Sequence, residues 1–205
     1  GDVYKRQFLI NDEDNTTPYG NRSLDIIVAP WPWVKLGTGK FRDDYLCSMF
    51  NGGNPEIEVT IHEHKSKKGI YMIEEMYGWP FLTEFFKGSQ EEIESQVKLT
   101  YTPVNITIDC SDPTKVVMPR QFTGIIDGDP AYGNYEIAMS TGGEGTLVNG
   151  VITFPQEALA FVCGAGSLKA NKSGLFRILL PGAELTDYTL SAVYDGMKVS
   201  ADGET

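Results

Sequence analysis

The sequence has few of the residues that metal clusters, redox motifs and nucleophilic active sites require. Its 205 residues include only three cysteines and two histidines. Cys47, Cys110 and Cys163 lie far apart and form no CxxC pair, which argues against a zinc cluster. We expect all three to be small buried hydrophobic residues, and the alternative is one disulfide with one free thiol. No serine lies in a GxSxG elbow, so the sequence does not indicate a serine hydrolase.

Positive charge is also scarce. Lys and Arg number 17 against 28 Asp and Glu, which gives a net charge of −11. This field repels phosphate backbones, so nucleic acid is not expected as a partner. The one dense basic run, residues 65–68, lies between two strand-like segments and is predicted to be a hairpin loop. No apolar run approaches the roughly eighteen residues that a membrane-spanning helix needs.

Short apolar runs separated by turn residues make up most of the chain. From Gly37 onward, Gly, Pro, Asn and Asp interrupt the sequence about every ten residues, which is typical of all-β proteins. Residues 56–64 alternate, with Ile57, Val59 and Ile61 on one face, as a half-buried antiparallel strand requires. We therefore predict an all-β fold, an antiparallel β-sandwich with at most one or two short helices. A closed β-barrel is the alternative.

Several other elements follow from local patterns. Hairpins are expected at Asn149-Gly150 and Asp195-Gly196, because both dipeptides tolerate the positive φ of a type I′ turn. A capping box at residues 89–92 predicts a short helix over about residues 90–98. Gly37-Thr-Gly39 lacks the third glycine of a nucleotide site and is predicted to be a turn. Further strands are predicted at residues 24–29, 70–74, 105–110, 115–118, 121–126, 135–139, 159–163 and 175–180. The expected core consists of Ile57, Val59, Ile61, Ile106, Ile108, Ile152, Phe154, Phe176 and Ile178.

The chain divides into three parts. Residues 1–35 are expected to be a leader, a tag or adapter remnant, or the tail of a preceding domain. The prolines near its end lack ladder donors, so residues 30–33 are not expected in a central strand. Residues 36–183 form the predicted main β domain. Residues 184–205 are expected to be an edge hairpin or the first strands of a following domain.

Two patterns are candidates for metal binding. His62 and His64 lie on the same face of a predicted strand, where a carboxylate such as Glu58 can complete a ligand set. The alternative is that both histidines face solvent beside a hairpin tip. Asp127 and Asp129 are candidate calcium ligands, since closely spaced carboxylates and loop carbonyls suit a hard cation, although the spacing is not that of an EF-hand. No other cofactor is expected.

Aromatic and acidic residues suggest contacts with sugars. Trp31 and Trp33 lie in a segment stiffened by proline, and Trp79 precedes Pro80 in what we interpret as an irregular stretch. Flat rings on rigid loops form sugar-binding platforms, and the alternative is that these rings close the end of a sheet stack. Neighbouring acids offer a glycosidase the two carboxylates it needs, while capping and surface solvation are their ordinary roles. These pairs are Asp43 with Asp44, Glu74 with Glu75, Glu91 with Glu92, and Asp127 with Asp129.

One ordered set of segments resembles a known group. Trp33-Val-Lys-Leu-Gly-Thr-Gly-Lys-Phe-Arg-Asp-Asp-Tyr-Leu46 resembles a W-x-x-x-G-x-G-x-(Y/F/W)-x-D-D element of secreted surface lipoproteins from gut Bacteroidetes. Residues 58–62 with 69–71, 106–116, 150–155 and 174–182 resemble later parts of the same proteins, in the same order. The resemblance covers residues 33–183. It implies an exported domain in the periplasm or on the outer-membrane surface, held by a lipid anchor upstream of Gly1, with a role in glycan handling or adhesion and no catalytic residues to transfer.

These observations lead to a functional prediction with two rivals. We predict a non-catalytic binding or adhesion module whose ligand is a glycan or another protein. The first rival is an enzyme, either a carboxylate-based glycosidase or one that uses a metal at His62 and His64. The second is a structural spacer domain within a larger surface protein.

Overall fold

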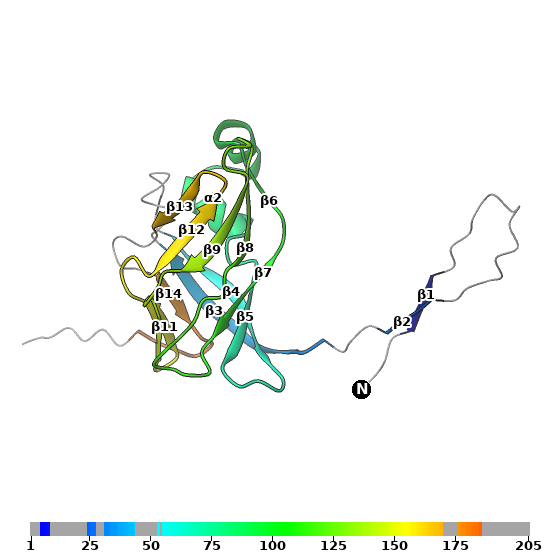
Figure 1. The fold of residues 1–205 in the computed structure, drawn as a ribbon, viewed down its shortest axis with the longest axis vertical. Coiled ribbons are helices and arrows are strands. Elements are labelled where there is room, and N and C mark those ends of the chain that lie inside the picture. Colours follow the sequence, from blue (N-terminus) through cyan, green and yellow to red (C-terminus); the bar gives the residue numbers. More distant parts are fainter. Residues whose placement is uncertain are drawn as a thin grey trace, which may run out of the picture.

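In the computed structural model, the chain folds mainly into two antiparallel β-sheets around one core (Figure 1). The structure describes residues 5–8, 24–27, 31–43, 53, 55–169 and 176–185. One sheet has seven strands and the other has five, and each keeps two edge strands. The prediction of an all-β antiparallel sandwich with few short helices is confirmed.

Every pair of neighbouring strands in the two sheets is antiparallel, and the spatial order of the strands differs from their order in the sequence. The seven-stranded sheet contains, in spatial order, β10 (Thr146–Val148), β11 (Val151–Phe154), β14 (Phe176–Leu179), β3 (Trp33–Asp43), β4 (Glu56–His64), β5 (Ile70–Glu74) and β7 (Asn105–Asp109). The five-stranded sheet contains β13 (Gly166–Lys169), β12 (Leu159–Cys163), β9 (Asn134–Met139), β8 (Gln121–Asp127) and β6 (Leu99–Tyr101). A separate pair joins β1 (Lys5–Phe8) to β2 (Leu24–Ile27). The helices are α2 (Trp79–Phe86) and α3 (Gln90–Glu92), and α3 continues as a π-helix, η1 (Ile93–Val97).

The alternating segments form the strands expected of them, with small differences at their ends. The expected core residues are buried, except Ile57, which is half-buried. The segment predicted as a strand at 115–118 is an exception, because it makes only two isolated bridges, Val117 to Asp109 and Val116 to Gly145. Pro119 follows directly and has no N–H with which to continue a ladder.

Local turn and capping signals are also confirmed. Asn149 and Gly150 have φ values of 50° and 78°, as a type I′ turn between β10 and β11 requires. The Ser89 hydroxyl accepts a hydrogen bond from the N–H of Glu92, whose carboxylate accepts one from the N–H of Ser89. The predicted hairpin at Asp195-Gly196 lies outside the described residues.

The boundaries of the sheet differ slightly from the predicted main domain. β3 begins at Trp33, so the seven-stranded sheet takes in residues 33–35 ahead of the predicted start at 36.

No helix in the described part of the chain is long and apolar enough to cross a membrane.

Aromatic rings fill the centre of the core. Phe41 on β3 has no exposed surface, and its ring centroid lies 5.2, 5.3 and 5.6 Å from those of Tyr77, Phe81 and Phe176. Helix α2 buries Phe81, Leu82 and Phe85 in the same cluster. These contacts join β3, β14 and the segment around α2 into one packed unit.

A carboxylate is buried beside these rings. Asp43, the last residue of β3, is 1% exposed and accepts a hydrogen bond from the hydroxyl of buried Tyr77 at 2.8 Å. Buried polar groups need such partners. The first aspartate of the D-D pair therefore has a structural role in the core.

Two of the three cysteines lie in the described residues, and both are free thiols. Cys110 is buried next to β7, and Cys163 is half-buried at the end of β12. The prediction of a small buried residue is confirmed for Cys110. Cys47 lies outside the described residues.

Cys110 is expected to stay unmodified when the native chain is treated with iodoacetamide near neutral pH. Burial raises the pKa of the Cys110 thiol to about 12, and the thiolate is the reactive form. Peptide mass spectrometry before and after denaturation measures the labelling, with half-buried Cys163 as the internal comparison. Labelling of Cys110 in the native chain at the rate seen after denaturation would contradict this expectation.

Candidate functional site

The first half of β3 lies at an open edge of the seven-stranded sheet. β4 pairs with nearly all of β3, whereas β14 pairs only with Lys40–Asp43. Within the described residues, positions 33–36 therefore have no strand beside them on the β14 side, whereas Leu179 and Pro181 lie close to Gly39 and Gly37. The register between β3 and β4 shifts around Leu36, which bulges from the ladder.

Exposed apolar side chains gather at this edge. Trp31, Val34 and Leu36 are 57%, 48% and 42% exposed, and we call these three residues the β3 edge patch. The other exposed large apolar residues in the described part of the chain, Tyr132 and Leu185 among them, are scattered. An apolar group concentrated within a few residues is typical of a binding surface.

Only one tryptophan is widely open to solvent. Trp33 is half-buried, and its ring packs edge-on against the ring of His64 with centroids 5.2 Å apart. Trp31 exposes more than half of its surface. The predicted pair is therefore one exposed ring beside one packed ring.

Trp79 is part of a helix. It is the first residue of α2, where it packs edge-on against Tyr101 with ring centroids 6.3 Å apart. The prediction of an irregular stretch here is wrong, because Pro80 sits in the first turn of a helix, where its fixed φ is favourable. Trp79 packs against the hydrophobic core.

The two candidate metal-binding histidines have different neighbours. His62 is only 7% exposed, and its Nε2 lies 2.5 Å from Oε1 of Glu74 on β5. The expectation that both histidines face solvent is wrong for His62, because β5 pairs beside it and places buried Met72 opposite it. His64 Nδ1 accepts a hydrogen bond from the N–H of Ser66 at 3.2 Å.

This arrangement gives the histidines no third ligand. Among the described residues, no three His, Cys, Asp or Glu side chains come together in a way that holds a metal ion. Nδ1 of His62 is buried without a hydrogen-bond partner. A metal at His62 and His64 remains a prediction that the structure does not strengthen.

Asp127 and Asp129 organise their own loop. Asp127 Oδ1 accepts the N–H of Asp129 at 2.8 Å, and Asp129 Oδ1 accepts the N–H of Ala131 at 2.9 Å. Asp127 Oδ2 also accepts the hydroxyl of Tyr135 at 3.0 Å. Burial and the bond to Asp127 raise the pKa of Tyr135, which keeps this hydroxyl a donor. These three hydrogen bonds use carboxylate oxygens of Asp127 and Asp129 that a calcium ion would need as ligands. Calcium binding at this loop stays a prediction.

An acidic groove lies beside β4. β5 ends at Glu74, so residues 57–60 of β4 have no strand next to them on that side within the described residues. A groove of about 250 Å³ is lined there by Ile57, Glu58, Val59, Thr60, Glu74, Glu75 and Pro80. The predicted acidic pair, Glu74 and Glu75, therefore lines the same groove as Glu58. Alternation places Glu58 on the outer face of its strand, and the strand predicted at residues 70–74 ends where β5 does, but the sequence does not show that Pro80 of α2 lies beside them.

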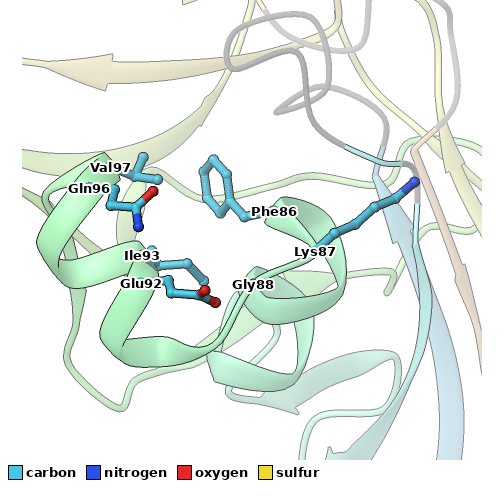
Figure 2. A pocket seen from close by; sticks show the side chains of 7 residues that line it. All are labelled: Phe86, Lys87, Gly88, Glu92, Ile93, Gln96 and Val97. Atoms are coloured by element: carbon cyan, nitrogen blue, oxygen red, sulfur yellow. The ribbon is translucent and has the colours of Figure 1, made fainter.

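A second hollow separates the end of α2 from η1 (Figure 2). It has a volume of about 190 Å³, and it is lined by Phe86, Lys87, Gly88, Glu92, Ile93, Gln96 and Val97. Sequence reasoning found the capping box at one side of the hollow. It missed α2, which supplies the other side.

Comparison with protein-family models, with curated proteins and with solved structures finds no match to this chain. The resemblance of residues 33–183 to secreted surface lipoproteins remains a prediction. Function is therefore argued from the geometry of the candidate sites.

Proposed function

We propose that the chain is a non-catalytic glycan-binding module that contacts its ligand through the β3 edge patch. The observation that carries the proposal is the exposed ring of Trp31, which precedes exposed Val34 and Leu36 by a few residues at the start of β3. A flat apolar ring packs against the C–H face of a sugar, and the ring loses little conformational freedom when it does so. The two aliphatic side chains enlarge the apolar surface that the sugar covers.

The arrangement of the histidines supports a role without catalysis. His62 is buried against Glu74 and exposes only 7% of its surface. The Ser66 hydroxyl lies 3.3 Å from Nδ1 of His64 in an exposed loop, but no carboxylate orients His64 within the described residues. A serine nucleophile needs a base that a third group holds in place.

The proposal includes export to the periplasm or to the outer-membrane surface. Its support is the sequence resemblance of residues 33–183. Nucleic acid is not part of the proposal, because the chain carries a net charge of −11.

Substitution of Trp31 by alanine is expected to weaken glycan binding about five- to tenfold, because the stacked ring is lost. Binding of the purified chain to a panel of host and dietary glycans measures this effect. Tyr132→Ala is the matched control, since Tyr132 is an exposed aromatic residue outside the patch. We expect the control to bind as the unmodified chain does.

Other outcomes separate the rivals. Absence of binding to every glycan contradicts the proposal and favours a protein ligand or a spacer role. Equal losses in Trp31→Ala and Tyr132→Ala contradict the assignment to the β3 edge patch. Release of free sugar would instead favour a glycosidase, and Glu58→Gln and Glu74→Gln then test the acidic groove.

A further inference from the structure

The hollow between α2 and η1 combines an apolar floor with a polar rim. Ile93 is 1% exposed, and Phe86 and Val97 are half-buried. Glu92 and Gln96 are exposed at the rim, and Figure 2 shows the Gln96 amide on the side that faces Phe86 and the Glu92 carboxylate turned toward Gly88. An apolar floor with a few convergent polar groups is typical of small-ligand sites.

The chain builds this hollow through two departures from regular helix. α2 ends at Phe86, and the next residue, Lys87, caps it in a left-handed conformation with φ of 54°. After α3, the backbone widens into the π-helix η1. Such wide turns are often found at functional sites.

The carboxylate of Glu92 is held in position. Its Oε2 accepts the N–H of Ser89 at 2.7 Å and the hydroxyl of Ser89 at 3.0 Å. The first of these bonds holds the pKa of Glu92 below its usual range, so the group stays ionised near neutral pH. Because both bonds use Oε2, neither occupies Oε1, and the Gln96 amide makes no hydrogen bond within the described residues.

The hydrogen-bonding groups around the hollow favour a ligand that both donates and accepts hydrogen bonds. Lys87 and Glu92 contribute opposite charges to the lining. In Figure 2 the Lys87 side chain extends away from the hollow, so its ammonium does not point at a bound group. A carboxylate acceptor and an amide that both donates and accepts suit a ligand with several hydroxyl groups.

We propose that this hollow binds one neutral, polyhydroxylated ring, such as a pyranose. The C–H face of the ring packs on Phe86, and neighbouring hydroxyls bond to Glu92 and Gln96. The site is separate from the β3 edge patch, so binding here does not require Trp31. The volume of about 190 Å³ suits a single small ring.

The test follows backbone amide shifts by NMR while one neutral sugar at a time is added, up to tens of millimolar. The probes are glucose, galactose, mannose, xylose and N-acetylglucosamine, with acetate and methylammonium as charged comparisons. We expect at least one sugar to shift the amides of Gly88, Ile93 and Val97 in a saturable way. We expect neither ion to do so.

Two variants test the polar rim. Gln96→Ala and Glu92→Gln are each expected to weaken sugar binding about five- to tenfold, because each removes a strong hydrogen-bonding partner. Glutamine also completes a capping box, so Glu92→Gln keeps the helix start. Glu91→Gln is the matched control, since Glu91 is exposed on α3 and does not line the hollow. We expect the control to leave the affinity unchanged.

The same spectra separate this proposal from the one at Trp31, because the Trp31 indole N–H reports on the β3 edge patch independently. Shifts at the Trp31 indole without shifts at Gly88, Ile93 and Val97 overturn the second site and leave the first. Shifts at the amides of Gly88, Ile93 and Val97 without a shift of the Trp31 indole signal overturn the β3 edge patch and leave the second site. An equal response to acetate or methylammonium, or unchanged affinity in both rim variants, also overturns the second site.

Discussion

Replacement of Phe41 by alanine is expected to lower the free energy of unfolding by about 3–5 kcal/mol. The Phe41 ring is fully buried and contacts Tyr77, Phe81 and Phe176, so its loss leaves a cavity that these neighbours fill only in part. A natural domain is stable by about 5–15 kcal/mol in total. The variant should therefore unfold at a much lower urea concentration, with little change in the slope of the transition.

Tyr132→Ala provides the comparison, since this ring is 39% exposed and lies outside the core. Its removal should change stability by less than about 1 kcal/mol. If both variants lost the same stability, Phe41 would not lie at the centre of the core.

Most strands could be predicted from the sequence because short apolar runs are separated by turn residues. In β4 the alternation of apolar and polar residues matches the observed strand bounds, and β5 has the bounds predicted for residues 70–74. Asn149-Gly150 and the capping box at Ser89 were predictable for a different reason, since each depends only on the conformation of adjacent residues. Tertiary contacts do not alter such signals.

Helix α2 was missed although its pattern is local. Trp79-Pro80 was interpreted as a break, although Phe81, Leu82 and Phe85 are spaced to share one face of a helix. The proline lies in the first helical turn, where it does not interrupt hydrogen bonding. Both hollows are lined in part by α2, which was not predicted, so neither could be located from the sequence.

Burial of His62 was missed for a different reason. Alternation places His62 on the outer face of β4, and outer faces are usually exposed. Here Glu74 and Met72 on β5 cover that face, and the Glu74 carboxylate binds the imidazole. The pairing of β4 with β5 was predictable, but the protection of one outer residue was not.

The segment Gly37-Thr-Gly39 was predicted to be a turn, but it lies within β3. Gly39, Phe41 and Asp43 are all buried, with more exposed residues between them. The spacing G-x-F-x-D therefore describes the inward face of one strand. Two of its members have no large apolar side chain, and this hides the alternation from a search for apolar residues.

Because Gly39 lies within β3 and close to β14, its replacement by alanine is expected to lower the free energy of unfolding strongly. A Cβ atom there would overlap the Leu179 carbonyl oxygen of β14 and lie 2.5 Å from Cδ1 of Ile61. Because a backbone oxygen cannot move without disturbing the pairing of β14 with β3, Gly39→Ala is expected to cost about 3 kcal/mol, near the upper end for overpacking.

Gly133→Ala separates this packing cost from ordinary glycine strain. Gly133 has φ of 62° and no atom within 4 Å of an added Cβ, so alanine should cost only about 1 kcal/mol there. Urea unfolding of both variants measures the difference. A cost at Gly39 no greater than at Gly133 would contradict close packing of β3 on β14. The expected order, with Gly39 the more costly, would show that this glycine is required because β14 approaches β3, which is a structural reason for its place in the G-x-G element.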